Sequence, residues 1–282
     1  MQEEAKTVRE GVGVIADLIK IAGDDPQVKE AAKNLGQTAV TITKTINTAL
    51  LPLAAVNFAF DRARQYFSGG FQRDLLDRTK DIPIDSIADP KPAVAGPALQ
   101  GLAFSHEEPN LKAMYLSLIA TSMDRRASHT AHPAFVEIIK QLDGQEAKLL
   151  AGLLQIPGAV PAIQIRAATI GKPGWQVKAN HVMNLSDLET KEPVVERGFA
   201  AMVDNWIRLG LVEVRYDQFV EGQDQYAWVE DRPEYTLLKA SVETEQVKVT
   251  FQRGHAGRTD FGKMFAEAVG LIEPSANLLP TQ

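Results

Sequence analysis

The residues with the clearest chemical potential are His129 and His132, which form the one closely spaced histidine pair in the chain. Metal sites use such pairs on one face of a helix, so the spacing raises the hypothesis of a metal site. Pro133 follows directly and disfavours helical geometry at His132. We therefore expect the pair to have a structural role in a loop between two helices, with no metal ligands and no cofactor.

The motifs of common enzyme classes are incomplete in this sequence. Asp260-Phe-Gly262 spells a kinase triplet, but no glycine-rich phosphate loop and no His-Arg-Asp motif accompany it. Gly171-Lys172 does not belong to a G-x-x-x-x-G-K-[ST] loop, and no G-x-S-x-G elbow occurs. The chain also has no cysteine, which excludes thiolate nucleophiles and thiolate metal sites. We expect a protein without enzymatic activity and without catalytic residues.

The overall charge disfavours a polyanionic partner. The 282 residues carry 30 basic and 36 acidic side chains, a net charge of −6, and 45% of them are hydrophobic. A net negative charge gives no general attraction to nucleic acid or to an acidic membrane surface, so any such contact must be local. The absence of cysteine and of a signal peptide is typical of a cytoplasmic protein.

The longest uncharged stretch, Thr45 to Phe60, is the segment with a potential binding function. It is shorter than the roughly 20 residues that cross a bilayer, and Pro52 interrupts it. It fits a buried core helix, and it also fits a membrane-associated or partner-binding element. In the second case, the residues that make the contact are Leu50, Leu51, Leu53, Val56, Phe58 and Phe60.

Apolar residues at helical spacing predict that residues 1–81 form an amino-terminal helical region. One amphipathic helix extends from about Thr7 to Ala22, and Asp24-Asp-Pro26 begins a second. Four prolines between Ile82 and Pro97 indicate a connector. A second region, residues 82–155, continues with a strong helix that begins at Pro109, a short helix after Pro133 and a helix that Asp143 caps.

The pattern changes after Pro157, where Ile163, Ile165 and Ala167 alternate and Gly171-Lys-Pro-Gly174 reads as a turn. A helix that ends at Gly210 leads into a strand, and we expect Tyr226 to Leu238 to return antiparallel to it. This order predicts a winged-helix-like α+β region over 156–270, followed by a loose tail, 271–282. The predicted fold is therefore mainly α: an amino-terminal helical bundle followed by an α+β winged-helix-like carboxy-terminal domain.

A family likeness lies in the middle of the chain. Its parts are Ile82-Pro83, Pro90, Pro92, the run GPALQGLAFSHEEPNLKAMYLSLIATSMDRR from Gly96 to Arg126, His132-Pro-Ala-Phe135 and Ile138-Ile-Lys-Gln-Leu-Asp143. This pattern resembles the Abi-alpha (abortive infection alpha) family, most closely from about Ile82 to Leu154. The resemblance implies a role in bacterial defence against phage by arrest or death of the infected cell. It implies no catalytic residue, because the shared positions look like helix starts and core.

Two kinds of function follow from the residues and the resemblance together. The first is a non-enzymatic phage-defence protein that acts through protein contacts, including self-association, or through membrane perturbation. The alternative is a winged-helix DNA-binding regulator, or a scaffold or sensor module. The acidic balance of the carboxy-terminal half disfavours nucleic acid. We expect a cytoplasmic protein for which membrane association remains open.

Overall fold

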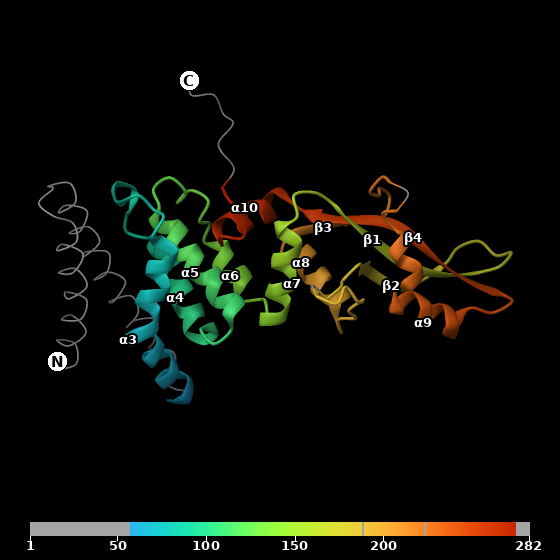
Figure 1. Ribbon diagram of the computed structural model, residues 1–282, viewed down its shortest axis with the longest axis horizontal. Helices are drawn as coiled ribbons and strands as arrows, with labels where there is room; N and C mark the ends of the chain where they lie inside the picture. Colours follow the sequence, from blue (N-terminus) through green and yellow to red (C-terminus); the bar gives the residue numbers. More distant parts are fainter. Residues whose placement is uncertain (1–56, 188, 223, 275–282) are drawn as a thin grey trace, which may run out of the picture. The chain divides into compact units, whose positions relative to one another are not determined.

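The computed structural model describes residues 57–187, 189–222 and 224–274, and Figure 1 shows their helices and strands. The contacts of the chain divide it into two compact units. The first unit consists of the described residues up to Leu149 and from Met264 onward, and the second consists of Leu150 to Lys263.

The first unit is helical. Its elements are α3 (Asn57–Thr79), the short 3-10 helix η2 (Ile84–Ser86), α4 (Pro92–Ser105), α5 (Pro109–Met123), α6 (Ala134–Ile139), the start of α7 (Gly144–Gln155) and the end of α10 (Asp260–Ala268). The fully buried side chains include Leu99, Leu102, Leu118, Ile119 and Phe135. Phe135 packs edge-to-face against Phe265, with ring centroids 5.3 Å apart. Helices α4 and α5 therefore share one apolar core with α6 and the end of α10.

The helix starts of this unit follow from local chemistry. Prolines stand at the first positions of α4 and α5, where no backbone N–H is needed. Asp143 caps α7, because its Oδ1 accepts the N–H of Glu146 at 2.6 Å. Pro97 lies inside α4, so the connector predicted up to that residue ends earlier, at Pro92.

The second unit is built on a four-stranded antiparallel sheet in the order β2-β1-β4-β3. Its strands are β1 (Val160–Thr169), β2 (Gln176–Met183), β3 (Val212–Arg215) and β4 (Val247–Arg258). The helical segments are the end of α7, α8 (Phe199–Arg208), η3 (Ala227–Asp231), α9 (Pro233–Val242) and the start of α10. Strand β4 pairs with β1 from Val160↔Ala256 to Thr169↔Val247 without a register shift. β1 and β4 therefore form the long centre of the sheet (Figure 1).

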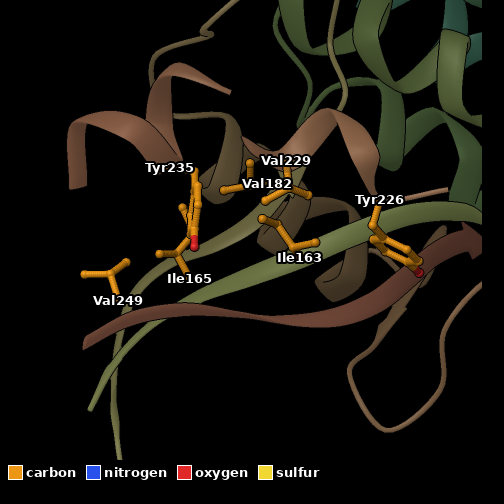
Figure 2. Close-up of a cluster of buried hydrophobic side chains, with 7 residues drawn as sticks. All are labelled: Ile163, Ile165, Val182, Tyr226, Val229, Tyr235 and Val249. Carbon is orange, nitrogen blue, oxygen red and sulfur yellow. The ribbon is translucent and has the colours of Figure 1, made fainter. Parts of the chain in front are cut away.

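One face of the sheet is covered by η3 and α9. Side chains from β1, β2 and β4 meet side chains from these helices in a buried apolar cluster, which Figure 2 shows. The members are Ile163, Ile165, Val182, Tyr226, Val229, Tyr235 and Val249. Because side chains alternate along a strand, Gln164 and Arg166 point to the opposite face.

A buried arginine holds the long connection between β2 and α8. The Arg232 side chain is 1% exposed and pairs with Glu234. Its Nη1 donates to the carbonyl of Leu185 at 2.6 Å, and its Nη2 donates to that of Val194 at 3.0 Å. A single guanidinium thus fixes two points of a connection that otherwise has little regular structure.

The expected fold class is wrong, because the chain is α+β rather than mainly α with an amino-terminal helical bundle. Tyr226 to Leu238 does not return as a strand: Pro233 opens α9 within it. Among the described strands the longest is β4, where Val247, Val249 and Phe251 alternate. The four-stranded sheet replaces the winged-helix-like arrangement. The strands of the described residues do lie after Pro157, as predicted.

Candidate functional site

Most of the predicted contact segment lies outside the described residues. Leu50, Leu51, Leu53 and Val56 belong to this undescribed part. Phe58 and Phe60 belong to α3, but the structure describes only their backbone. The predicted amphipathic helix, Thr7 to Ala22, also lies outside. Within the described part of the chain, no helix is long and apolar enough to cross a bilayer.

The two motifs with apparent chemistry make local packing and hydrogen-bond contacts. His132 Nδ1 accepts the N–H of Ala134 at 3.1 Å at the start of α6, and its ring lies 5.8 Å from that of Phe135. The described residues contain no cluster of three or more side chains suited to a metal ion. In Asp260-Phe-Gly262, a Cβ at Gly262 would lie 1.9 Å from the Leu211 carbonyl, so close packing requires this glycine.

The strongest candidate surface lies on the central strands of the second unit. Strands β1, β2 and β4 carry five basic residues and no acidic residue. The basic residues are Arg166, Lys178, Lys248, Arg253 and Arg258. The sequence from Ala147 to Ser186 is also free of Asp and Glu, although the chain as a whole is acidic. Local charge on this sheet is therefore opposite in sign to the net charge.

Arg166 is held in place without a carboxylate. Its Nε donates to Gln164 Oε1 at 2.7 Å and its Nη1 donates to Gln252 Oε1 at 3.0 Å. Its guanidinium carbon lies 4.3 Å from the ring centre of Trp175, a cation–π contact. Amide oxygens and an indole orient the cation without neutralising it, which is the arrangement that suits recognition of an anion. We call the face formed by Gln164, Arg166, Trp175, Lys248 and Gln252 the hairpin face.

The turn that joins β1 to β2 exposes apolar side chains. Ile170 is 61% exposed, Trp175 58% and Val177 45%. Gly171 and Gly174 adopt φ values of 78° and 89°, which a glycine accepts without strain, and they complete the predicted turn. Lys172 lies in this turn and Lys178 follows it, both exposed. We call residues 170–178 the hairpin tip: apolar side chains with basic neighbours and no acidic residue.

A histidine network lies beside the hairpin face. His181 Nε2 is 3.1 Å from Asp204 Oδ1, and its Nδ1 is 3.0 Å from the hydroxyl of Tyr216. The same hydroxyl accepts the N–H of His181 at 2.9 Å. The direction of the second hydrogen bond depends on the tautomer of His181: when the phenol donates to Nδ1, the Nε2 proton is donated to Asp204.

Asp204, His181 and Tyr216 are linked in the order carboxylate, imidazole and hydroxyl, as in a catalytic relay, but their contacts hold three segments together. We call these three residues the clamp. Burial raises the pKa of Tyr216, and Asp204 adds to this effect while the His181 N–H and Arg166 oppose it. The phenol therefore stays protonated and is a poor nucleophile. His181 is buried, has both ring nitrogens bonded and adopts φ 55°, which is uncommon for a residue with a side chain. The cluster connects β2, α8 and the end of β3.

Sequence motifs did not reveal this surface. His181 stands alone in the sequence, and its partners are 23 and 35 residues away. A signal was nevertheless present in the run without acidic residues from Ala147 to Ser186. The net charge of the whole carboxy-terminal half is acidic, so it does not indicate a basic sheet. The acidic residues of this half lie outside β1, β2 and β4.

Comparison with known proteins agrees with the likeness seen in the middle of the chain. The sequence model of a family described as "Abortive infection alpha" matches residues 63–269, which is most of the chain. No curated protein and no solved structure matches.

Proposed function

Because the chain belongs to the abortive infection alpha family, which suggests a role in abortive infection, we propose that it acts there by binding rather than by catalysis. The proposed contact is reversible attachment of the hairpin tip and the hairpin face to an anionic membrane surface. The observation that carries this proposal is the hairpin tip itself, which combines exposed Ile170, Trp175 and Val177 with lysines and no acidic residue.

This composition suits the boundary between lipid headgroups and acyl chains. Tryptophan prefers that boundary, and lysines next to it reach the headgroup phosphates. Each cation near an anionic leaflet contributes about 1 kcal/mol. Burying the exposed parts of three large apolar side chains adds roughly 2 to 4 kcal/mol. The sum, reduced by the cost of immobilisation, corresponds to weak and reversible binding.

The clamp beside the hairpin face supports a role in binding. Its hydrogen bonds are satisfied within the second unit, and its phenol stays protonated, so it offers no activated nucleophile. It fixes the sheet next to Arg166 instead. A nucleic acid would also match Arg166 and Trp175, but it would leave the aliphatic side chains of Ile170 and Val177 without a role.

Vesicle flotation tests the proposal. We expect the full chain to float with vesicles that contain phosphatidylglycerol and not with pure phosphatidylcholine vesicles, and added salt should weaken the binding. The double variant Lys172→Glu/Lys178→Glu should lose most of it, and Trp175→Ser should weaken it at every salt concentration. Lys80→Glu is the control, another exposed lysine but in the first unit, and should bind like wild type.

Three results would contradict the proposal. The wild type could fail to float with any vesicle, or the double variant could float as well as the wild type, which would move the contact to another segment. Salt-sensitive binding to DNA without vesicle binding would assign the hairpin face to nucleic acid instead. Expression in cells challenged with phage connects binding to defence: variants that no longer float should no longer reduce plaque formation.

A further inference from the structure

Arg166 on the hairpin face has hydrogen-bond donors that no residue of the described chain uses. A guanidinium carries five N–H groups. The Nε–H donates to Gln164 and one Nη1–H donates to Gln252, and both acceptors are neutral amides. The second N–H of Nη1 and both N–H groups of Nη2 have no partner among the described residues. In this part of the chain the buried polar atoms without a partner belong to other side chains, so Nη2 is accessible from solvent.

Two further donors share the face of the sheet with Arg166. Thr250 of β4 lies directly opposite Arg166 of β1, which places the two Cβ atoms about 5 Å apart on one face. The hydroxyl of Thr250 has no hydrogen-bond partner among the described residues. Lys248 precedes Thr250 by two positions, so its exposed side chain stands on the same face. A guanidinium, a hydroxyl and an ammonium therefore line two adjacent strands that contain no acidic residue.

Trp175 determines how an anion can approach the guanidinium. Its ring centre lies 4.3 Å from the guanidinium carbon of Arg166, so the indole covers one flat side of the cation. The unused N–H groups point outward in the plane of the guanidinium, where they can make parallel hydrogen bonds to two oxygens of one anion. Trp175 also belongs to the hairpin tip and is 58% exposed. When the tip contacts a membrane, the free edge of Arg166 therefore lies close to the headgroup phosphates.

We propose that Arg166, Thr250 and Lys248 form a subsite for the phosphate of a phosphomonoester lipid headgroup. This inference rests on the proposed membrane contact and names the headgroup that the contact prefers. A phosphomonoester has three terminal oxygens and a charge of about −1.5 to −2 near pH 7, whereas a phosphodiester has two free oxygens and one negative charge. Two oxygens of the monoester bind Arg166, and the third accepts the hydroxyl of Thr250. Lys248 balances the second negative charge, which a phosphodiester lacks.

Equilibrium binding of the full chain to two kinds of vesicle tests the subsite. One contains phosphatidic acid, a monoester, and the other phosphatidylglycerol, a diester, each mixed with phosphatidylcholine to the same zeta potential. Wild type should bind the phosphatidic acid vesicles about threefold to tenfold more tightly. Arg166→Lys keeps the charge but loses the planar fork, so it should bind both vesicles equally. Thr250→Val keeps the side-chain shape and should reduce the preference.

A matched control and the melting temperature separate the subsite from other effects. Arg215→Lys changes an arginine of the same sheet whose Nε and Nη2 already bind Asp217, and it should keep the wild-type preference. All three variants should melt near the wild-type temperature, because each replaces a side chain outside the apolar core.

The possible outcomes distinguish the subsite from the membrane contact itself. Equal binding of wild type to both vesicles overturns the subsite and leaves the membrane contact standing, whereas no binding to either overturns both. A preference that survives in Arg166→Lys also overturns the subsite. Glycerol 3-phosphate carries the same phosphomonoester without acyl chains, and at an equal phosphate concentration it should not displace wild type from phosphatidic acid vesicles. Displacement at that concentration would assign the subsite to a soluble phosphomonoester and overturn the lipid headgroup as its ligand.

Discussion

Removing the hydroxyl of Tyr216 tests the clamp beside the hairpin face. Tyr216→Phe keeps the aromatic ring, which stacks near His181 with ring centroids 6.1 Å apart, and deletes two hydrogen bonds. It leaves the N–H and Nδ1 of His181 without their partner. Each lost hydrogen bond costs about 1 kcal/mol, and leaving a buried group unpaired costs about 1 to 3 kcal/mol. We expect a loss of about 2 to 4 kcal/mol in the free energy of unfolding.

Urea denaturation, followed by tryptophan fluorescence in a Trp175→Phe/Trp228→Phe background and by circular dichroism, measures this loss. Trp206 is fully buried in α8, the helix that carries Asp204, so its emission reports on this part of the second unit. Tyr235→Phe is the matched control, because its hydroxyl has no hydrogen-bond partner among the described residues. If Tyr216→Phe and Tyr235→Phe unfold at the same urea concentration, the clamp contributes nothing and the hydrogen-bond argument is refuted.

Three further substitutions test other parts of the structure. Leu118→Asp places a charge at a fully buried position of α5 and should cost several kcal/mol or prevent folding, whereas Leu76→Asp, at an exposed position of α3, should leave thermal melting nearly unchanged. Arg232→Lys should cost at least 2 kcal/mol, because an ammonium group cannot reach both carbonyls and Glu234, and amide hydrogen exchange should then increase from Leu185 to Val194 more than elsewhere. Asp124→Asn should cost about 1 kcal/mol at neutral pH, because Asp124 Oδ1 accepts the N–H of Arg126 and both carboxylate oxygens bind its guanidinium. Arg126 lowers the folded-state pKa of Asp124, so this stability is present above the ordinary carboxyl pKa and is lost as the pH falls through the lowered one. Urea midpoints of wild type and Asp124→Asn should therefore converge in acid, and a constant difference down to pH 2 would exclude this ionic contribution.

The helix starts and helix ends could be predicted because they depend on a few neighbouring residues. Pro109 begins α5, Asp143 caps α7, and Thr259 Oγ1 caps α10 by accepting the N–H of Gly262 at 2.8 Å. Gly210 ends the α8 segment with φ 74°. Each signal combines a fixed backbone geometry with one side chain, so no knowledge of distant residues is required.

The sheet could be predicted only in part because its pairing is between distant segments. The hairpin of β1 and β2 is local, and its turn is visible in the sequence. Strand β4 pairs with residues about 80 to 100 positions earlier, and short apolar runs do not reveal their partner. Tyr226 to Leu238 has enough aromatic and aliphatic residues to suggest a strand, but they pack on the sheet from η3 and α9 instead.

The candidate sites depend on contacts between distant residues even more strongly than the sheet does, so they could not be predicted from the sequence. Arg166 is oriented in part by Gln252 of β4, which stands opposite Gln164 in the β1–β4 ladder and reaches Arg166 diagonally. Tyr115 lies on the buried face of α5, and the lack of a hydrogen-bond partner for its hydroxyl among the described residues is a property of the packed helices. Sequence reasoning predicts which residues are buried, whereas the satisfaction of a polar group requires the coordinates of its neighbours.

The position of β4 in the sheet has a consequence for synthesis of the protein. Strand β4 lies between β1 and β3 but is the last of the four to leave the ribosome. The β1–β2 hairpin can close early, since its strands are adjacent in the chain, whereas β1 and β3 gain their shared neighbour only after residue 247. Gln252, which orients Arg166, arrives with that strand. A nascent or truncated chain that stops before β4 therefore exposes the hairpin tip but lacks the ordered guanidinium, so the hairpin face cannot assemble before β4 has been synthesised.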